Sequence, residues 1–470
     1  ILAVWGVNVL RAALPEELPR ISTVTLDIRV LGVAALASIV TGLLFGLAPA
    51  LQLSRTGARS ALRDGSRGVT VGGTRLRAGL VVSQIALAVV LTIGGGLFLS
   101  SFVRVANVDL GLDPRDVLTM RIWPRVDSSQ PGARQQAVAR SGVAIPEILD
   151  RISAIPGVVS AGFVAGDLPL TGYSAPAEVV VPERKQRFEG PNRVQVRFVT
   201  PGYARAVGTP LVRGRYIEAG DTRGSTPVVV LNEEAAARYV GDGEPLGATI
   251  TIERGYAPQA TVVGVVANVR LGGPESAVRP EAYLPAAQGM FLGGSLAVRT
   301  TGEPLALADA VRDAIRPSFP GIADPEAETM ASLLSGIIAQ RRFNMLIVGL
   351  FAAVALTIAS AGLYGVMAYA VTQRTREIGV RLALGAPPGR LMRAVIGRGV
   401  AHTAAGVATG IAVAWPLAVS VEAFLFQVRP HDPVIYGAAA ALLGICGIAA
   451  AIVPARRAAR VHPVIAMRVE

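Results

Sequence analysis

Few residues of this chain have the types and spacing that catalysis, metal binding or phosphate binding requires. A P-loop holds nucleotide phosphates with a Gly-Lys-Ser/Thr sequence, but the only lysine is Lys185, within Glu-Arg-Lys-Gln. The chain therefore cannot hydrolyse ATP by that route. Three histidines are present, and none has the spacing of metal ligands: His402, His431 and His462. We predict no catalytic residue, no cofactor site and no metal site on this chain.

The other candidates for chemistry each have a structural interpretation beside the functional one. His402 lies one turn into an apolar segment, where it could serve a proton relay or be a neutral side chain near a membrane surface. Gly94-Gly95-Gly96 could form a cofactor loop, but inside an apolar helix glycines more often permit close helix packing. Asp167 and Glu233 are scattered carboxylates, which we interpret as solvated surface residues.

The most distinctive segment, residues 374–399, contains six arginines and a single acid, Glu377. Its apolar residues fall on roughly one face of a helix, with arginines opposite: Ile378, Leu382, Leu384 and Ala386. On periodicity alone, this pattern predicts an elbow helix that lies on the inner leaflet of a membrane and turns its arginines toward anionic lipid.

The elements around these residues are long apolar stretches without charge. Five are enclosed by the charged residues Arg29 and Arg55, Arg77 and Arg104, Arg342 and Arg374, Arg398 and Glu422, and Asp432 and Arg456. Each has at least 23 uncharged residues, whereas about 20 are enough for a helix to cross a bilayer. Such a span must be helical, because only a helix satisfies its own backbone in lipid. The sequence therefore predicts an integral membrane protein. We interpret residues 1–10 as the end of a sixth span.

Arginine counts predict the orientation of the spans. Segments 52–77 and 374–398 each hold six arginines and one acid, and the C-terminal tail adds more arginines, whereas segments 11–29 and 422–432 are balanced. The positive-inside rule places the arginine-rich segments in the cytoplasm. With five spans, residues 104–342 are then outside. The net charge of +12 is thus explained by orientation rather than by nucleic acid, and we predict no nucleic-acid partner.

Residues 104–342 alternate strand and helix patterns, which predicts a mixed α/β domain. Stretches rich in β-branched residues predict strands at 158–164, 193–199, 227–231, 261–269 and 295–299. Helices are predicted at 134–155, 232–240, 303–316 and 325–341, with Asn232 as an N-cap. The last of these helices continues into the third span, so motion of the domain could be passed into the membrane.

An internal repeat lies at two membrane exits. Residues 49–63 and 454–468 align without gaps, with Pro, Ala, Arg, Ala and Arg at matching positions. Each segment follows a span that leaves the membrane inward. Short Arg/Ala-rich exits can look alike by chance, but the equivalent positions favour duplication of a bundle, as occurs in transporters.

Several motifs carry a resemblance to a known family. RTREIGVRLALGA (374–386) and PARRAARVHPVIAMR (454–468) resemble the FtsX-like/MacB-like permeases, the membrane subunits of type VII ABC systems. PGVVSAGF, TPGYARAVGTPLVRGR, VVGVVANVR and RPEAYLP resemble the periplasmic core domain of that family. GLAPALQLSRTGARSALRDGSRG followed by RAGLVVSQIALAVVL resembles the centre of duplicated acidobacterial-type permeases.

The resemblance implies an α-helical transmembrane bundle with a large inserted mixed α/β periplasmic domain. The implied domains are the end of a first permease half at 1–51 (partial span 1–10, span 30–51), a cytoplasmic linker at 52–77, a transmembrane helix at 78–103, the periplasmic core domain at 104–342, a three-helix FtsX-like transmembrane domain at 343–455 and a cytoplasmic tail at 456–470.

The resemblance also implies partners and a mechanism. Such permeases work in the bacterial inner membrane as dimers, or pseudo-dimers of two halves, with a separate cytoplasmic ATPase that binds the ATP. Closure of the ATPase is relayed to the periplasmic domain, which is called mechanotransmission, and a periplasmic adaptor or envelope protein can take part. The RTREIG segment implies the ATPase contacts Arg374, Arg376, Glu377, Ile378, Gly379, Arg381, Leu384 and Gly385. The chain departs from the family pattern in the two prolines after Gly385, which can start but not continue a helix.

Two functions remain open on these motifs. The chain could be an efflux or extrusion permease, or a non-transporting relay that controls an envelope enzyme or sensor. An outer-membrane channel or adaptor as partner would favour the first function, and a peptidoglycan hydrolase or sensor kinase the second.

Overall fold

The structure is a computed structural model of the 470-residue chain. It describes residues 71–459 apart from 125, 127–128, 130, 172–174, 185, 191–192, 254–256, 320–321, 323 and 374–386, together with seven residues between 28 and 39. Several predicted segments lie outside the described residues: the span at 1–10, nearly all of the span at 30–51, most of the linker and residues 460–470. Both copies of the predicted repeat also lie in large part outside them.

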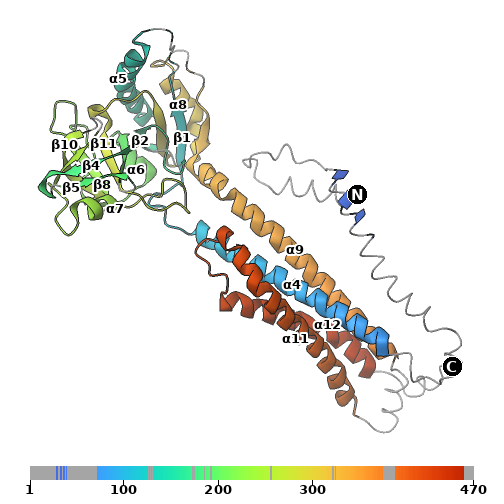
Figure 1. The fold of residues 1–470 in the computed structure, drawn as a ribbon. Coiled ribbons are helices and arrows are strands. Elements are labelled where there is room, and N and C mark those ends of the chain that lie inside the picture. Colours follow the sequence, from blue (N-terminus) through green and yellow to red (C-terminus); the bar gives the residue numbers. More distant parts are fainter. Residues whose placement is uncertain are drawn as a thin grey trace, which may run out of the picture. The chain divides into compact units, whose positions relative to one another are not determined.

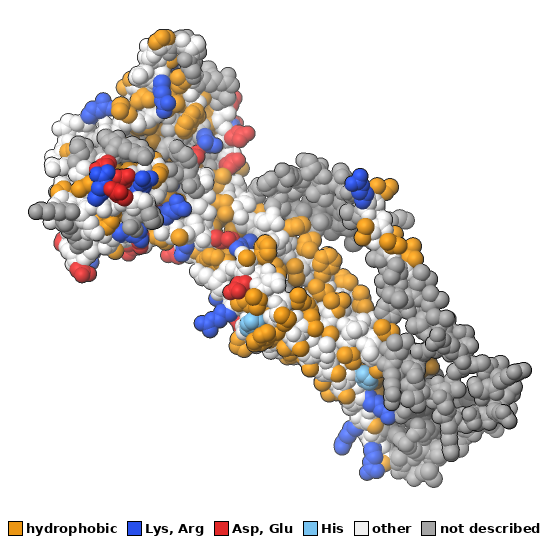
Figure 2. Space-filling view, in the orientation of Figure 1, with side chains coloured by type: hydrophobic (Ala, Val, Ile, Leu, Met, Phe, Trp, Pro, Cys, Tyr) orange, Lys and Arg blue, Asp and Glu red, His pale blue; other side chains and the backbone are white. Residues whose placement is uncertain are grey.

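The chain divides into two compact units. The helical unit comprises residues up to Arg104 and from Ala339 onward, and the α/β unit comprises Val105–Ile338. Figure 2 shows hydrophobic side chains over the visible face of the helical unit, whereas most acidic side chains in view belong to the α/β unit.

The α/β unit contains one sheet of thirteen strands among its described residues (Figure 1). The strands are β1 (Val117–Ile122), β2 (Val158–Ala165), β3 (Ala175–Ala177), β4 (Val179–Val181), β5 (Gln186–Phe188), β6 (Val194–Val199), β7 (Leu211–Gly214), β8 (Val228–Asn232), β9 (Thr249–Ile252), β10 (Ala257–Val266), β11 (Glu281–Pro285), β12 (Gly294–Thr300) and β13 (Ala327–Thr329). They follow the order β13-β1-β12-β2-β6-β11-β8-β10-β9-β4-β5, while β3 pairs with β6 and β7 with β10. The pairs β6–β11 and β8–β10 are parallel.

Alternation along β1 shows how the first half of this sheet is covered. Leu118, Met120 and Ile122 pack in one core with side chains of α5 (Ala133–Ser153) and α8 (Ala308–Ile315). Val117 instead packs on the opposite face with α6 (Tyr203–Val207). Successive side chains of a strand point to opposite faces, so helices cover both faces here. The other half of the sheet packs on α7 (Glu233–Ala235) and the short π-helix Ala236–Val240 that continues it.

The helical unit contains helices long enough to cross a membrane. They are α4 (Val71–Ala106), α9 (Met330–Gln373), α11 (Pro388–Ser420) and α12 (Pro433–Ala459). Their apolar stretches are Ala78–Ala106, Met330–Tyr369, Met392–Ser420 and Pro433–Arg456, the four candidate membrane spans among the described residues. The predicted fold class, a helical membrane bundle with an inserted mixed α/β domain, is therefore confirmed.

The glycine cluster of α4 lies in the helix interface, as the packing interpretation predicted. A Cβ atom at Gly95 would lie 3.7 Å from Cβ of Ala352 on α9. A Cβ atom at Gly96 would lie 2.8 Å from Ile435 on α12, which is closer than real Cβ contacts allow. Glycine therefore lets three helices of the unit approach one another.

All five predicted strands of the α/β unit are confirmed with small shifts at their ends, and the N-cap Asn232 accepts a hydrogen bond from Ala235 N at 2.9 Å. The helix predicted at 325–341 is wrong in its first residues. Residues Ala327–Thr329 form β13, which pairs with β1, and the helix begins at Met330. Pairing with a distant strand overrides the helical pattern of this segment.

Candidate functional site

The connection between α11 and α12, residues 421–432, is hydrogen-bonded to two other helices of the helical unit. Arg104, near the end of α4, donates through Nη1 to the carbonyl of Gln427. Arg341 of α9 donates through Nη1 to the carbonyl of Phe424. Both bonds are charge-assisted, which makes them stronger than bonds between neutral groups. The connection is thus held by the two helices that lead to and from the α/β unit in the sequence.

Ser101 completes this set of bonds, which we call the 421–432 tie. Its Oγ accepts from the backbone N–H of Phe426 at 2.9 Å and from Arg341 Nη1 at 3.1 Å. The residue is 1% exposed, so these polar groups are satisfied inside the bundle rather than by water. Any relative displacement of α4 and α9 must break or rearrange the tie.

The histidines of the helical unit have contacts that fit a structural role. His431 stacks on Trp415 with ring centroids 3.9 Å apart, and its Nε2 lies 2.9 Å from the Trp415 carbonyl. His402 Nδ1 lies 2.7 Å from the carbonyl of Arg398, one turn back in the same helix. This contact with its own helix fits a structural role for the His402 ring.

A buried charge pair lies in the middle of the α/β sheet. Arg197 of β6 and Glu281 of β11 are 3% and 0% exposed, with Nε and Oε2 3.4 Å apart. Tyr283 donates its hydroxyl to Glu281 Oε2 at 2.9 Å, and Arg197 Nη1 donates to the carbonyl of Asp167 at 2.9 Å. Burial raises the pKa of Glu281 to about 7, while Arg197 and the hydroxyl of Tyr283 act to lower it.

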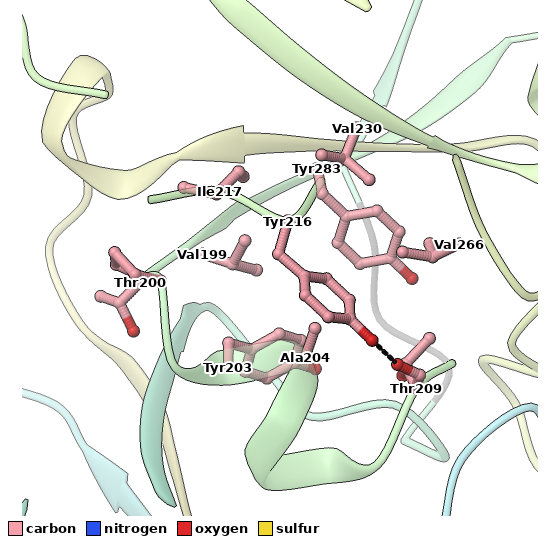
Figure 3. A pocket seen from close by; sticks show the side chains of 11 residues that line it. Val199, Thr200, Tyr203, Ala204, Thr209, Tyr216, Ile217, Val230, Val266 and Tyr283 are labelled. Carbon is pink, nitrogen blue, oxygen red and sulfur yellow. Dashed lines mark hydrogen bonds between the residues drawn. The ribbon is translucent and has the colours of Figure 1, made fainter. Parts of the chain in front are cut away.

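Figure 3 shows a small cavity beside this pair, lined by Tyr203, Tyr216 and Tyr283 among others. The hydroxyl of Tyr216 donates to the carbonyl of Thr209 at 2.7 Å (Figure 3). The cavity holds about 20 Å³, whereas small-molecule sites hold about 300–1,000 Å³. It is therefore part of the packed core and not a substrate site.

A much larger cavity of about 610 Å³ lies along α5; we call it the α5 groove. Residues 142, 145, 146, 149, 150 and 153 form one wall, a spacing that puts them on one face of a helix. The other walls come from residues 159–161 of β2, the turn 199–202 after β6, the segment 217–222 and residues 285–291.

Close backbone contact shapes the side of the groove next to β2. A Cβ atom at Gly162 would lie 2.2 Å from Tyr203 Cα, and one at Gly202 would lie 2.0 Å from the carbonyl oxygen of Ala161. Both positions therefore exclude any side chain. These contacts give a physical reason for the glycines in the SAGF and PGYA motifs of the sequence.

A third cavity, of about 440 Å³, has a lining that includes the charged residues Arg121, Asp167 and Glu328. Asp167, interpreted from the sequence as a solvated carboxylate, is partly exposed, and its carboxylate lies 2.8 Å from the largely exposed Arg121. Glu233 is exposed, as expected. No group of three or more His, Cys, Asp or Glu that could hold a metal ion occurs among the described residues.

The predicted ATPase contacts lie outside the described residues. All eight fall within 374–386, so the structure neither brings them together nor separates them. The structure instead shows features that the sequence interpretation missed: the Arg197–Glu281 pair, the 421–432 tie and the α5 groove. The available signal for the first was Arg197 inside the strand VQVRFV, in which every residue except Gln195 and Arg197 is apolar.

The chain has apolar helices that can cross a membrane and a mixed α/β unit between the first and the second of them. These features define a multi-span membrane protein of the permease type. Residues 78–318 match the family described as MacB-like periplasmic core domain, and residues 349–463 match the FtsX-like permease C-terminal family. The first match covers more than half of the chain, so the chain belongs to the FtsX-like/MacB-like family of ABC permeases, and the resemblance seen in its motifs is confirmed.

Curated relatives share this part of their length. The chain is 28% identical over 316 residues to a macrolide export ATP-binding/permease protein MacB of Chromobacterium violaceum, covering 65% of this chain and 49% of that protein. It is 28% identical over 318 residues to a pyoverdine export ATP-binding/permease protein PvdT of Pseudomonas putida, covering 65% and 47%. The chain thus spans about half the length of these relatives.

Among solved structures, the periplasmic region of MacB from Actinobacillus actinomycetemcomitans is 16% identical and matches 48% of this chain and 94% of that one, with a TM-score of 0.33. This score is too low to bear on the fold.

Proposed function

We propose that this chain is the permease subunit of an ABC-type export system in a bacterial inner membrane. Residues 104–342 face the periplasm, and the arginine-rich inner segments and the C-terminus face the cytoplasm. A separate cytoplasmic ATPase binds and hydrolyses ATP, and its closure moves the α/β unit. Family membership and the positive-inside pattern support this proposal.

The observation that carries the coupling is the continuity of α9. This helix runs without a break from Met330 to Gln373, directly before the predicted ATPase-contact segment at 374–386. Its first residues belong to the core of the α/β unit, where Met330 is 0% exposed. A continuous hydrogen-bonded helix transmits displacement along its length, whereas a flexible linker would absorb it.

Export rather than signal relay is favoured by the relatives, since the names of MacB and PvdT both state export. We extend this activity to the present chain as part of the proposal, together with a dimer or pseudo-dimer of permease halves and a periplasmic adaptor. A relay would use the same helices without substrate movement. ATP-driven substrate transport in proteoliposomes distinguishes the two functions.

Glu377 provides the test of the ATPase contact. It is the only acid among six arginines in 374–398, and at helical spacing it contributes only about 0.3–0.5 kcal/mol to folding if exposed. Removing one partner of a charge pair at an interface costs about 2–5 kcal/mol. We therefore expect Glu377→Ala to keep its expression and melting temperature but to bind the ATPase less well in pull-down titrations.

The control is Arg390→Ala, an exposed residue at the start of α11 outside the proposed contacts, which should leave recruitment unchanged. Unchanged ATPase binding in Glu377→Ala would instead favour an elbow helix on lipid. Nucleotide hydrolysis by the purified chain without its partner would contradict the proposed division of labour.

A further inference from the structure

The α5 groove has the size and the walls of a small-molecule site. Its volume of about 610 Å³ falls within the range of about 300–1,000 Å³ that such sites occupy. The lining is mostly apolar, with Ile145 and Leu149 from α5, Val159 from β2, and Ile217 and Phe291 opposite. Val159 is 58% exposed, so apolar surface is open to water within the groove.

The charged residues that line the groove are all acidic: Asp150, Glu218 and Asp221. Asp221 already has a partner, because Arg215 donates to its two oxygens at 2.8 and 2.9 Å. Asp150 and Glu218 are exposed, and neither forms a salt bridge with another described residue. Glu218 interacts with the same Arg215 only through its field. An apolar groove whose lining charges are all negative is complementary to a ligand with an apolar body and a positive charge.

We propose that the α5 groove binds a small amphiphilic organic cation. The apolar body of the ligand packs against Pro146, Leu149 and Val159, which line the groove with free surface, and its cationic group is held by the carboxylates of Asp150 and Glu218. Apolar contacts supply most of the affinity, whereas the carboxylates select for charge. The interpretation of the groove as a substrate site rests on the proposed export function. Binding of the cation itself needs neither ATP nor a partner protein.

The test measures dye binding by the purified full chain in nanodiscs of zwitterionic lipid, without an ATPase. The probe is rhodamine 6G, a lipophilic cation, and Nile red, a neutral lipophilic dye, is the control; empty nanodiscs give the background. We expect saturable binding of rhodamine 6G that weakens with added salt. Because Asp150→Asn/Glu218→Gln removes both negative charges, it should bind the cation about tenfold more weakly or worse, with Nile red unchanged.

A matched control lies on the same helix. Glu147 is exposed one turn from Asp150 but does not line the groove, so Glu147→Gln should bind rhodamine 6G like the unaltered chain. Leu149→Ala should weaken both dyes, because it removes part of the apolar wall. Equal melting temperatures of the variants show that the fold is kept, and the single variants Asp150→Asn and Glu218→Gln replace the double variant if it does not fold.

Three results would overturn the inference: no saturable cation binding above empty nanodiscs, no loss in the acid variants, or an equal loss in Glu147→Gln. The first is also the result expected if a second copy of the chain or a protein segment covers the groove. If the cation binds as described but ATP-driven transport fails with the partner present, the proposed export function is wrong and the binding site remains.

Discussion

At the scale of single residues, the main electrostatic feature of the α/β unit is the Arg197–Glu281 pair. Both side chains are buried between adjacent parallel strands, where desolvation offsets much of the attraction between the charges. The pair therefore adds little net stability, but each member becomes costly when the other is removed. Its position in the centre of the sheet makes it a marker of correct strand pairing.

The raised pKa of Glu281 predicts how stability depends on pH. The folded pKa is about 7, compared with an ordinary value of 4.5. The contribution of Glu281 to the free energy of unfolding is fully present below pH 4.5 and is lost as the pH rises toward 7. The reason is that the folded state binds the proton of Glu281 more tightly than the unfolded state does. The loss is on the order of 3 kcal/mol at most. Between pH 5 and pH 7.5, hydrogen exchange of the β6 and β11 amides should therefore speed up by more than the intrinsic exchange rate does.

The control variant is Glu281→Gln, which should lack this change with pH. Other carboxylates act in the opposite direction, since hydrogen bonds from Arg115 and Arg215 lower the pKa values of Asp113 and Asp221. Their contribution to stability is present above their ordinary pKa and is lost as the pH falls. The difference between the unaltered chain and the variant isolates Glu281, and an identical pH profile in both would contradict its raised pKa.

A second prediction concerns the energetics of the pair. Arg197→Met leaves Glu281 buried without its cation, so the free energy of unfolding should fall by about 3–5 kcal/mol. Arg197→Met/Glu281→Leu removes both charges and should recover most of that loss. Denaturant unfolding followed by exchange of the β6 and β11 peptides measures both. A double variant that recovers none of the loss relative to the unaltered chain would show that the pair itself stabilises the sheet.

At the scale of elements, the 421–432 tie links three helices of the helical unit through side-chain donors and backbone carbonyls. Arg341 contributes to it from within α9, the helix that begins in the α/β core. The connection also packs on the core of the bundle through Leu425 and Val428, so the directional bonds of the tie add to apolar contacts. Through Arg341 the tie joins α9 to the connection between α11 and α12.

We predict that Arg341→Ala loosens this connection without unfolding the bundle. The amide of Phe426, which donates to Ser101, should exchange about fivefold to tenfold faster, since a hydrogen bond to a charged group contributes about 1.5–3 kcal/mol and only part of it protects this amide. Arg342→Ala is the matched control, because Arg342 is the exposed neighbour in the same helix. Equal exchange in both variants would mean that the tie does not order the connection.

Some strands could be predicted from their own β-branched residues, such as Val158–Ala165 and Val228–Asn232. Others were missed although they contain such residues, such as β1 (VLTMRI), β4 (VVV) and β9 (TITI). β13 was missed because Ala-Glu-Thr has no strand signal and is ordered by pairing with β1. The α5 groove could not be predicted either, because its walls come from five segments spread over residues 142–291.

At the scale of the whole molecule, the predicted orientation can be tested because the chain has a single cysteine, Cys446. In a Cys446→Ser background, Gly224→Cys should react with a membrane-impermeant maleimide from the periplasmic side. No atom lies within 4 Å of a Cβ at Gly224, so the substitution is tolerated. Arg390→Cys, at the exposed start of α11, should react only after the inner membrane is permeabilised. The reverse pattern would mean that the topology is inverted.

The position of β1 in the sheet has a consequence for biogenesis. β1 pairs with β12 and β13, so Leu118 lies beside Val298 and Thr329. A ribosome must therefore synthesise the chain nearly to α9 before these strands can pair, and pairing over such separations is slow. Strand edges of the α/β unit remain open in the meantime and are prone to aggregate. The sheet of this unit can therefore be completed only after its last strand, β13, has been synthesised.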